Sequence, residues 1–290
     1  SVVFRTLVMS RNLTYDRSWD VALAIEGSPT GRNRRDNEGL RDLVAALPGL
    51  AAIPVHRGRR QQAESIAEEV HTVEWTLPDG FEALWFESLG LRSRRWRFPQ
   101  NQRLAVISPF VSEEGLRALS DSTHEAVALI SRPEELDKLS GSTRQLFQQN
   151  LVLREALESE SGEDTLVGGS VLRGLHAKVY IANSGWDTSI FLGSANATKA
   201  AIVDCINVEL LAGLTGKKSK VKGIDELLSS QGLGNALELY SPGNPPAEEA
   251  DVVAARARLE EARKLLSTAE LRISCQGEKD DWQLTLLPAG

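Results

Sequence analysis

The side chains with the clearest chemical potential lie in residues 174–214. His176 and Lys178 stand two residues apart on a predicted strand, so both side chains share one face of the sheet. Ser194 and Asn196 follow in a Gly-Ser-x-Asn turn after a second apolar strand, and Glu209 starts a third. A lone histidine on an apolar strand is more often a core residue, and Ser and Asn are common in turns. The lysine favours a functional set, because lysine is rarely buried without a partner.

These residue types suit the cleavage of a phosphodiester. Lys178, Ser194 and Asn196 can donate hydrogen bonds to phosphate oxygens. A neutral histidine such as His176 can attack phosphorus, and a second histidine can protonate the leaving oxygen. A carboxylate, here Glu209, can orient a histidine and stabilise its charged form. This mechanism needs no metal, and the sequence has no credible His and Cys ligand cluster, so no metal or cofactor is expected.

The N-terminus repeats part of this pattern. The segment FLGSANAT at 191–198 aligns with LVMSRNLT at 7–14, and VELLAGLTG at 208–216 aligns with WDVALAIEG at 19–27. Three site residues therefore have counterparts: Ser10 for Ser194, Asn12 for Asn196, and Asp20 for Glu209. A His-x-Lys at the matching distance from Ser10 would fall before Ser1, so the first copy is incomplete. The repeat predicts two half-sites that grip one phosphate, with any first His-x-Lys upstream of Ser1.

At these residues the sequence resembles the phospholipase D superfamily, whose pattern is H-x-K-x4-D followed by a G-S-x-N turn, usually present twice. The segments HAK at 176–178 and GSAN at 193–196 match this pattern. Asn183 stands where the family usually has Asp, and Asp187 follows four residues later in a predicted loop. Some nuclease members lack this Asp and use an acid after the turn, where Glu209 and its counterpart in the first copy fall. The resemblance implies that His176 is the nucleophile.

The resemblance also implies the fold. It predicts a phospholipase D-like α/β protein with mixed sheets flanked by helices, in two pseudo-symmetric half-domains of which the first is incomplete. Alternating strands and helices after residue 100 agree with a parallel or mixed sheet. Three domains are predicted: 1–100, the rest of the first half-domain plus an insertion; 101–240, the second half-domain with both motifs; and 247–290, a long helix and the start of a further module.

Periodicity and turn residues predict the individual elements. Strands are expected at 2–8, which should be buried, and at 19–25, 103–111, 126–131, 271–274 and 282–287. Pro48 and Gly49 should end a helix over 38–47, Ser112 should cap a helix over 113–119, and a long helix should cover 247–269. The segments 73–77 and 83–86 should form a hairpin around Pro78-Asp79-Gly80, and residues 145–157 should be helical.

Composition is typical of a soluble globular protein. The chain has 290 residues, of which 41% are hydrophobic and 25% charged, enough for two modest domains. Its net charge of −7 gives no overall basic field, although a local basic groove can exist on an acidic protein. Cys205 and Cys275 provide no disulfide framework, and no signal peptide or membrane span is found. A cytoplasmic location is expected.

Two basic clusters could line a path for nucleic acid. Their members are Arg57, Arg59 and Arg60 in one cluster, and Arg94 and Arg95 with the neighbouring Trp96 in the other. Arginines bind the phosphate backbone and aromatic rings stack on bases. Each cluster alone also fits a solvated face of a helix or hairpin.

The leading hypothesis is a metal-independent phosphodiesterase with a phosphohistidine intermediate, acting as a nuclease on DNA or RNA in bacterial restriction or phage defence. Its partners would be nucleic acid and helicase or other defence subunits, and a homodimer is an open option. Two alternatives remain: a phospholipid hydrolase or transferase, and a non-catalytic nucleic-acid-binding module of a larger helicase-type machine.

Overall fold

The structure, a computed structural model, describes most of the chain. The described residues are 2–10, 18–52, 54–91, 96–154, 174–242, 271–278 and 281–288, with isolated positions between 255 and 269. The chain divides into two units, Ser1–Gly243 and Asn244–Gly290. The predicted boundary near residue 100 falls inside the first unit. No helix in the described part of the chain is both long and apolar enough to cross a membrane.

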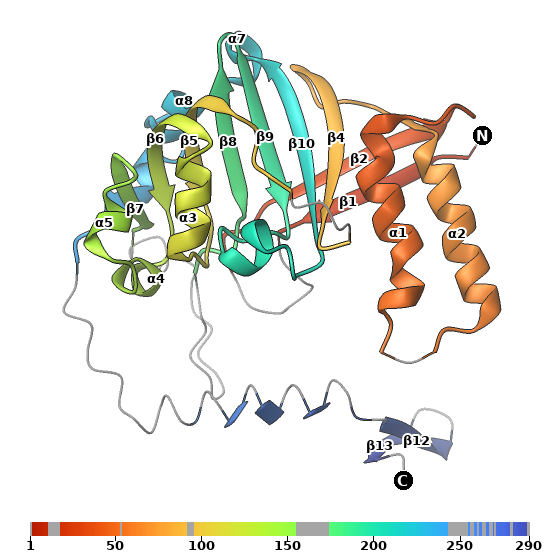
Figure 1. Cartoon of the computed structure of the whole chain (residues 1–290). Coiled ribbons are helices and arrows are strands. Elements are labelled where there is room, and N and C mark those ends of the chain that lie inside the picture. The colour runs from red at the N-terminus through yellow and green to blue at the C-terminus, as the bar shows by residue number, and fades with distance from the viewer. Residues whose placement is uncertain are drawn as a thin grey trace. The chain divides into compact units, whose positions relative to one another are not determined.

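An eight-stranded mixed sheet forms the centre of the first unit, in the order β11-β7-β6-β5-β8-β9-β10-β4 (Figure 1). Its strands are β4 (Phe81–Leu89), β5 (Asn101–Ile107), β6 (Thr123–Ile130), β7 (Gln149–Leu153), β8 (Val179–Ser184), β9 (Asp187–Gly193), β10 (Glu209–Lys217) and β11 (Leu237–Leu239). The neighbours β5, β6 and β7 are parallel, and the remaining pairs are antiparallel. The predicted mixed sheet with flanking helices is confirmed.

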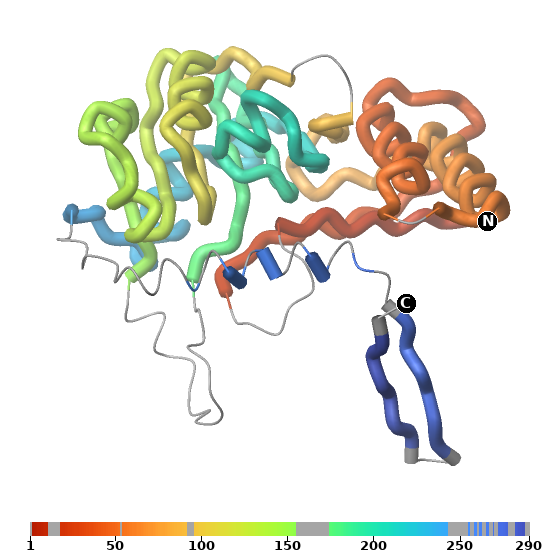
Figure 2. The backbone as a smooth tube through the Cα atoms, turned by 60° about the horizontal axis from the view of Figure 1, so that its bottom comes forward, coloured from red at the N-terminus to blue at the C-terminus, as the bar shows by residue number. Residues whose placement is uncertain are grey.

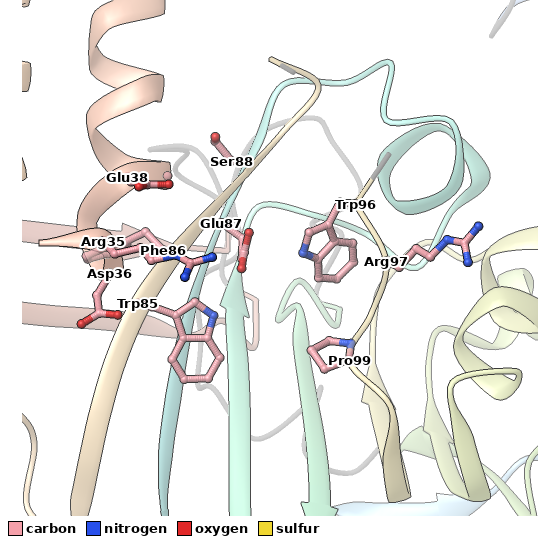
Figure 3. Close-up of a pocket in the computed structure, with 11 residues that line it drawn as sticks. Arg35, Asp36, Glu38, Trp85, Phe86, Glu87, Ser88, Trp96, Arg97 and Pro99 are labelled. Carbon is pink, nitrogen blue, oxygen red and sulfur yellow. The ribbon is translucent and has the colours of Figure 1, made fainter. Parts of the chain in front are cut away.

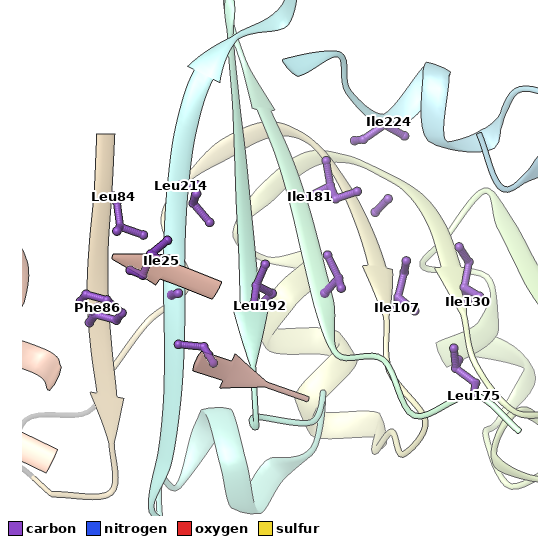
Figure 4. Packing of buried hydrophobic residues seen from close by; sticks show 14 of the residues in the cluster. Ile25, Leu84, Phe86, Ile107, Ile130, Leu175, Ile181, Leu192, Leu214 and Ile224 are labelled. Carbon is purple, nitrogen blue, oxygen red and sulfur yellow. The ribbon is translucent and has the colours of Figure 1, made fainter. Parts of the chain in front are cut away.

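A smaller antiparallel sheet lies against one face of the large sheet. Its strands are β1 (Phe4–Met9), β2 (Ala22–Pro29) and β3 (Val73–Trp75). Val8 of β1 and Ile25 of β2 belong to the same buried cluster as Leu192 and Leu214 of the large sheet. Figure 4 shows Ile25 beside this row of strands. Burial of apolar side chains between the two sheets therefore fixes the N-terminal strands against β9 and β10.

Helices complete the first unit. They are η1 (Arg35–Asn37), α1 (Glu38–Leu50), α2 (Arg57–His71), α3 (Glu113–Ser120), α4 (Pro133–Asp137), α5 (Gly141–Arg144), η2 (Lys199–Val203), α7 (Lys218–Val221), α8 (Ile224–Leu228) and η3 (Gly234–Ala236). Leu116 of α3 and Ile202 of η2 pack on the opposite face of the sheet, against Tyr180 and Phe191. The Ser112 hydroxyl caps α3 as predicted, accepting a bond from the Gly115 amide at 3.1 Å.

Two predicted elements are wrong. The segments 73–77 and 83–86 do not form a hairpin, because β3 pairs with β2 while β4 pairs with β10 in the other sheet. Residues 149–153 form β7 rather than part of a helix, because the strand pairs with β6 and β11. In both places a partner distant in sequence decides the structure, and local periodicity cannot reveal it.

Two further predictions need correction. The strand predicted at 2–8 is β1, but only Val8 of that strand is buried, because β1 lies at the edge of its sheet. Helix α1 continues to Leu50 and includes Pro48 in its last turn instead of ending before it.

The second unit contains a hairpin of β12 (Leu271–Glu278) and β13 (Asp281–Pro288). Both strands were expected, at 271–274 and 282–287. Most of the long helix predicted at 247–269 lies outside the described residues.

Candidate phosphodiesterase site

The candidate residues meet at one end of the large sheet. The directions of the strands bring the carboxyl ends of β5, β6 and β9 to the same edge as the amino ends of β8 and β10. Lys178 lies just before β8, Ser194 just after β9, and Glu209 begins β10. Residues far apart in sequence are thus neighbours in space. They lie at the end of the sheet where parallel strands finish, which is where α/β proteins commonly place their sites.

His176 and Lys178 lie in an extended segment before β8 and not on a strand proper. The N-terminal part of the chain holds this segment in place. The Trp19 amide donates to the Gly174 carbonyl at 3.1 Å, and the Trp19 carbonyl accepts from the His176 amide at 2.8 Å. Figure 2 shows this part of the chain in red beside the green segment that precedes β8. Instead of the predicted strand, the structure has an extended segment whose backbone pairs with Trp19.

Lys178 is the buried cation of the site, only 6% exposed. Its Nζ donates to the carbonyl oxygen of Ser10 at 2.7 Å and to that of His176 at 3.2 Å. An ammonium group has three N–H donors, so one remains for a further acceptor. Burial lowers the pKa of Lys178, while the charges of Asp20 and Glu209 act in the opposite direction.

Ser10 and Asp20 form a compact unit at the end of β1. The Ser10 amide donates to the Val21 carbonyl at 3.1 Å, and the Val21 amide donates to the Ser10 hydroxyl at 3.2 Å. The Ser10 hydroxyl in turn donates to the Asp20 carboxylate. This unit places the Ser10 carbonyl in contact with Lys178, 168 residues further along the chain.

Ser194 and Glu209 repeat the same arrangement at the end of β9. The Ser194 amide donates to the Leu210 carbonyl at 3.0 Å, and the Leu210 amide donates to the Ser194 hydroxyl at 3.1 Å. The Ser194 hydroxyl also bonds the Glu209 carboxylate. Serine, acid and the residue after the acid thus take equivalent positions in the two copies. The five-residue difference between the loops is accommodated without changing this register.

The two acids act on the same cation. Burial raises the pKa of Glu209, and hydrogen bonds from Ser194 and Asn207, together with the charge of Lys178, oppose that rise. Lys178 interacts electrostatically with Asp20 as well. A buried ammonium that interacts with carboxylates is far less costly than an isolated one. The arrangement can therefore keep a positive charge at the site while leaving one of its N–H groups for an anion.

The Gly-Ser-x-Asn turn is fixed by contacts to other strands. The Ala197 amide donates to the hydroxyl of Ser108, at the end of β5, at 2.9 Å. The phenol of Tyr180 donates to the Ala195 carbonyl at 2.9 Å. The buried Oδ1 of Asn196 has no hydrogen-bond donor among the residues that the structure describes. A substrate hydroxyl, a protonated group or water would satisfy it, and such orphaned atoms require an explanation.

Arg132, which follows β6, is a residue that the motifs did not reveal. Its Nε donates to the Leu175 carbonyl at 2.9 Å, and its guanidinium lies over the Phe110 ring, 4.9 Å from the centroid. Its charge lowers the pKa of Lys178. A second cation thus stands near the first. An arginine two residues after an apolar strand that ends at the site was the available signal.

Two residues considered for the family's Asp lie elsewhere. Asn183 is buried near the far end of β8, where its Oδ1 accepts from Thr188. Asp187 accepts from Lys217 at 2.6 Å at the same far end. Neither is brought to Lys178, so the acids available to the site are Asp20 and Glu209.

The predicted arginine clusters are not part of this site. Arg57, Arg59 and Arg60 are exposed on the first turn of α2, a helix that packs on α1 beyond β4 (Figure 1). Arg94, Arg95 and, at the second half-site, Asn12 lie outside the described residues. Trp96 lines a cavity on the sheet face that α3 covers.

Comparison with known proteins adds no family assignment: no model of a protein family matches the chain, and no curated protein matches it. Within the described residues, no three His, Cys, Asp or Glu side chains gather as a set of metal ligands.

Proposed function

We propose that the chain is a metal-independent phosphodiesterase of the phospholipase D type, acting on nucleic acid, with His176 as nucleophile and two pseudo-symmetric half-sites around one phosphate. The observation that carries this proposal is the hydrogen bond from Lys178 to Ser10. It joins the His-x-Lys segment of one copy to the serine and acid of the other. Two serine–acid pairs around one buried cation are expected of a site that binds one anion from two sides.

The proposed reaction has two displacements at phosphorus. The neutral imidazole of His176 attacks, a P–N bond forms, and the P–O bond to the leaving group breaks as that oxygen takes up a proton. The resemblance assigns this proton to a second histidine. Water then attacks phosphorus and gives a proton to the second histidine, the P–N bond breaks, and His176 is regenerated.

The remaining side chains stabilise charge in these steps. The free N–H of Lys178 and the amide of Asn196 donate to the non-bridging oxygens, whose charge grows in the transition state. Arg132 adds a second positive charge that acts on Lys178. Glu209 and Asp20 balance the lysine, so that the empty site does not hold an uncompensated buried cation.

A cleavage assay tests the proposal. Fluorescently labelled single-stranded and duplex DNA and RNA are incubated with the protein in EDTA, and His176→Ala is compared with His124→Ala, which changes an exposed histidine. Cleavage is expected in EDTA, lost in His176→Ala and retained in His124→Ala. A substrate labelled at phosphorus should also leave an acid-labile label on the protein.

Two outcomes would contradict the proposal. Cleavage that persists in His176→Ala would exclude this nucleophile. Binding without any turnover would favour a non-catalytic module, and choline release from phosphatidylcholine vesicles without nucleic-acid cleavage would favour a lipid substrate.

A further inference from the structure

A groove lined by both aromatic and charged residues lies on the sheet face that α3 and η2 cover. It consists of two cavities, of about 790 and 320 Å³, which share Trp96 and Arg97 in their walls. The larger cavity is bounded by the start of α1 and by Trp85 of β4. Its volume is within the range of pockets that hold a nucleotide-sized ligand.

Aromatic rings line the inner side of this groove. Trp85 packs edge-on against Phe191, with centroids 5.5 Å apart, and Trp96 packs edge-on against Phe98 at 5.8 Å. Phe98 and Phe191 contact each other at 4.9 Å. The two phenylalanines are buried, whereas both tryptophans are partly exposed and line the larger cavity. Figure 3 shows Trp85 and Trp96 on either side of Glu87.

The aromatic cluster is connected to the candidate site through one residue. Phe98 contacts Tyr180, with centroids 5.6 Å apart, and the Tyr180 phenol donates to the carbonyl of Ala195, between Ser194 and Asn196. Tyr180 is also two residues from Lys178 along the chain. The groove and the phosphate-binding residues are therefore supported by one continuous set of contacts.

The charges in the larger cavity argue for a base as its occupant and against a run of phosphates. Arg35 and Arg97 provide cations, but Asp36, Glu38 and Glu87 line the same cavity. Carboxylates repel phosphate, whereas they accept hydrogen bonds from N–H groups on the edges of unpaired bases, such as the N3–H of thymine. Indole rings stack on any base, and arginine adds a favourable charge.

We infer that this groove binds an unpaired nucleobase of the substrate strand, stacked on Trp96 and Trp85, next to the phosphate held at Lys178. This inference rests on the proposed function and deepens it, because it names single-stranded nucleic acid as the substrate class. In a duplex each base is covered by its neighbours and its partner, so its face cannot reach the tryptophans without being flipped out.

Binding measurements with a labelled oligothymidylate test the inference. Fluorescence anisotropy is recorded in the His176→Ala protein, so that turnover does not interfere, and again after adding Trp96→Ala, Trp85→Ala or Trp96→Phe. Each tryptophan-to-alanine change is expected to weaken binding about 5- to 150-fold. Trp96→Phe keeps a ring and should retain most of the affinity. A duplex of the same length should bind more weakly and lose little on substitution.

Trp186→Ala is the matched control, because Trp186 is 84% exposed on the turn between β8 and β9, outside the groove. The affinity of Trp186→Ala for the oligothymidylate should equal that of its parent. Circular dichroism of each variant establishes that it is folded. The inference is overturned if folded Trp96→Ala and Trp85→Ala proteins bind the oligothymidylate as tightly as their parent.

The two proposals fail in different ways. Cleavage of a single strand that is unaffected by both tryptophan changes would leave the phosphodiesterase proposal standing and remove the groove. Tryptophan-dependent binding without cleavage by the unsubstituted protein would leave the groove standing and remove the catalytic proposal.

Discussion

At the scale of single residues, Lys178 is the position where the proposed function and the stability of the fold oppose each other. Its ammonium is buried, and the contacts that offset this cost are two carbonyl oxygens and the charges of two acids. An apolar side chain of similar length would avoid the cost of burying the charge. A buried lysine in such surroundings is therefore explained better by anion binding than by folding.

The burial of Lys178 predicts that the stability difference between the protein and a Lys178→Met variant depends on pH. Because burial lowers the pKa of Lys178 in the folded protein, the unfolded chain binds this proton more tightly. Folding stability should therefore rise as the pH increases from the folded pKa of this lysine towards its ordinary value of 10.5. Lys178→Met should lack this contribution, and it should also lower turnover by about 10²-fold or more.

Urea unfolding at a series of pH values measures the first effect. The quantity of interest is the difference in the free energy of unfolding between Lys178→Met and its parent. Other groups that titrate at alkaline pH contribute equally to both proteins. Lys220→Met, an exposed lysine outside the site, is the control and should follow the parent. Parallel curves for Lys178→Met and its parent would show that the lysine is not buried as described.

Residue identities predicted which serine pairs with which acid better than they predicted the residues around those pairs. The equivalence of Ser10 with Ser194 and of Asp20 with Glu209 follows from aligned sequence, and the same hydrogen bonds occur at both places. Arg132 could not be found in this way. Its proximity to residues 174–178 depends on the order of strands in the sheet, which no local pattern contains.

At the scale of elements, the turn after β9 depends on close contact with β10. Gly193 has a φ of +156°, and a Cβ at this position would lie 2.0 Å from the Leu210 carbonyl oxygen. That carbonyl also accepts the Ser194 amide, so a shift there displaces the serine of the site.

Gly193→Ala is therefore expected to destabilise the fold by about 2 kcal/mol or more and to reduce activity further in the molecules that remain folded. Gly49→Ala is the control, because a Cβ placed there at the end of α1 meets no described atom within 4 Å apart from its own chain neighbours and helix backbone. That change should be neutral or stabilising by up to about 1 kcal/mol. Thermal unfolding of the two variants measures the contrast, and equal effects would contradict the close approach.

Helices and strands with a clear pattern in their own sequence were predictable. Elements that depend on pairing with a strand distant in sequence were not. Ser112 followed by an amphipathic segment identified α3, and runs of buried apolar residues identified β5 and β6. The turn at 78–80 resembled a hairpin but joins strands of two different sheets. In that case the gain from pairing β4 with β10 outweighs the local preference of the turn.

At the scale of the whole molecule, the acidic balance limits how the proposed nucleic-acid substrate can bind. The net charge is −7, so a broad electrostatic attraction to phosphate is not expected. The cations assigned to the site and the groove are Lys178, Arg132, Arg35 and Arg97. Affinity should then come from a few phosphate contacts and from base stacking, in contrast with proteins that bind through a basic surface.

The salt dependence of binding measures this directly. Each neutralised phosphate of a single strand contributes about −0.7 to the slope of log K against log salt, so four cations predict a slope no steeper than about −3. Anisotropy titrations of His176→Ala with the oligothymidylate at increasing KCl give the slope. A slope near −5 would mean that further basic surface takes part, and replacing Arg57, Arg59 and Arg60 by Gln would then reduce it. Because the structure puts those arginines on α2, away from Lys178, the expected result is that this triple change leaves the slope unaltered.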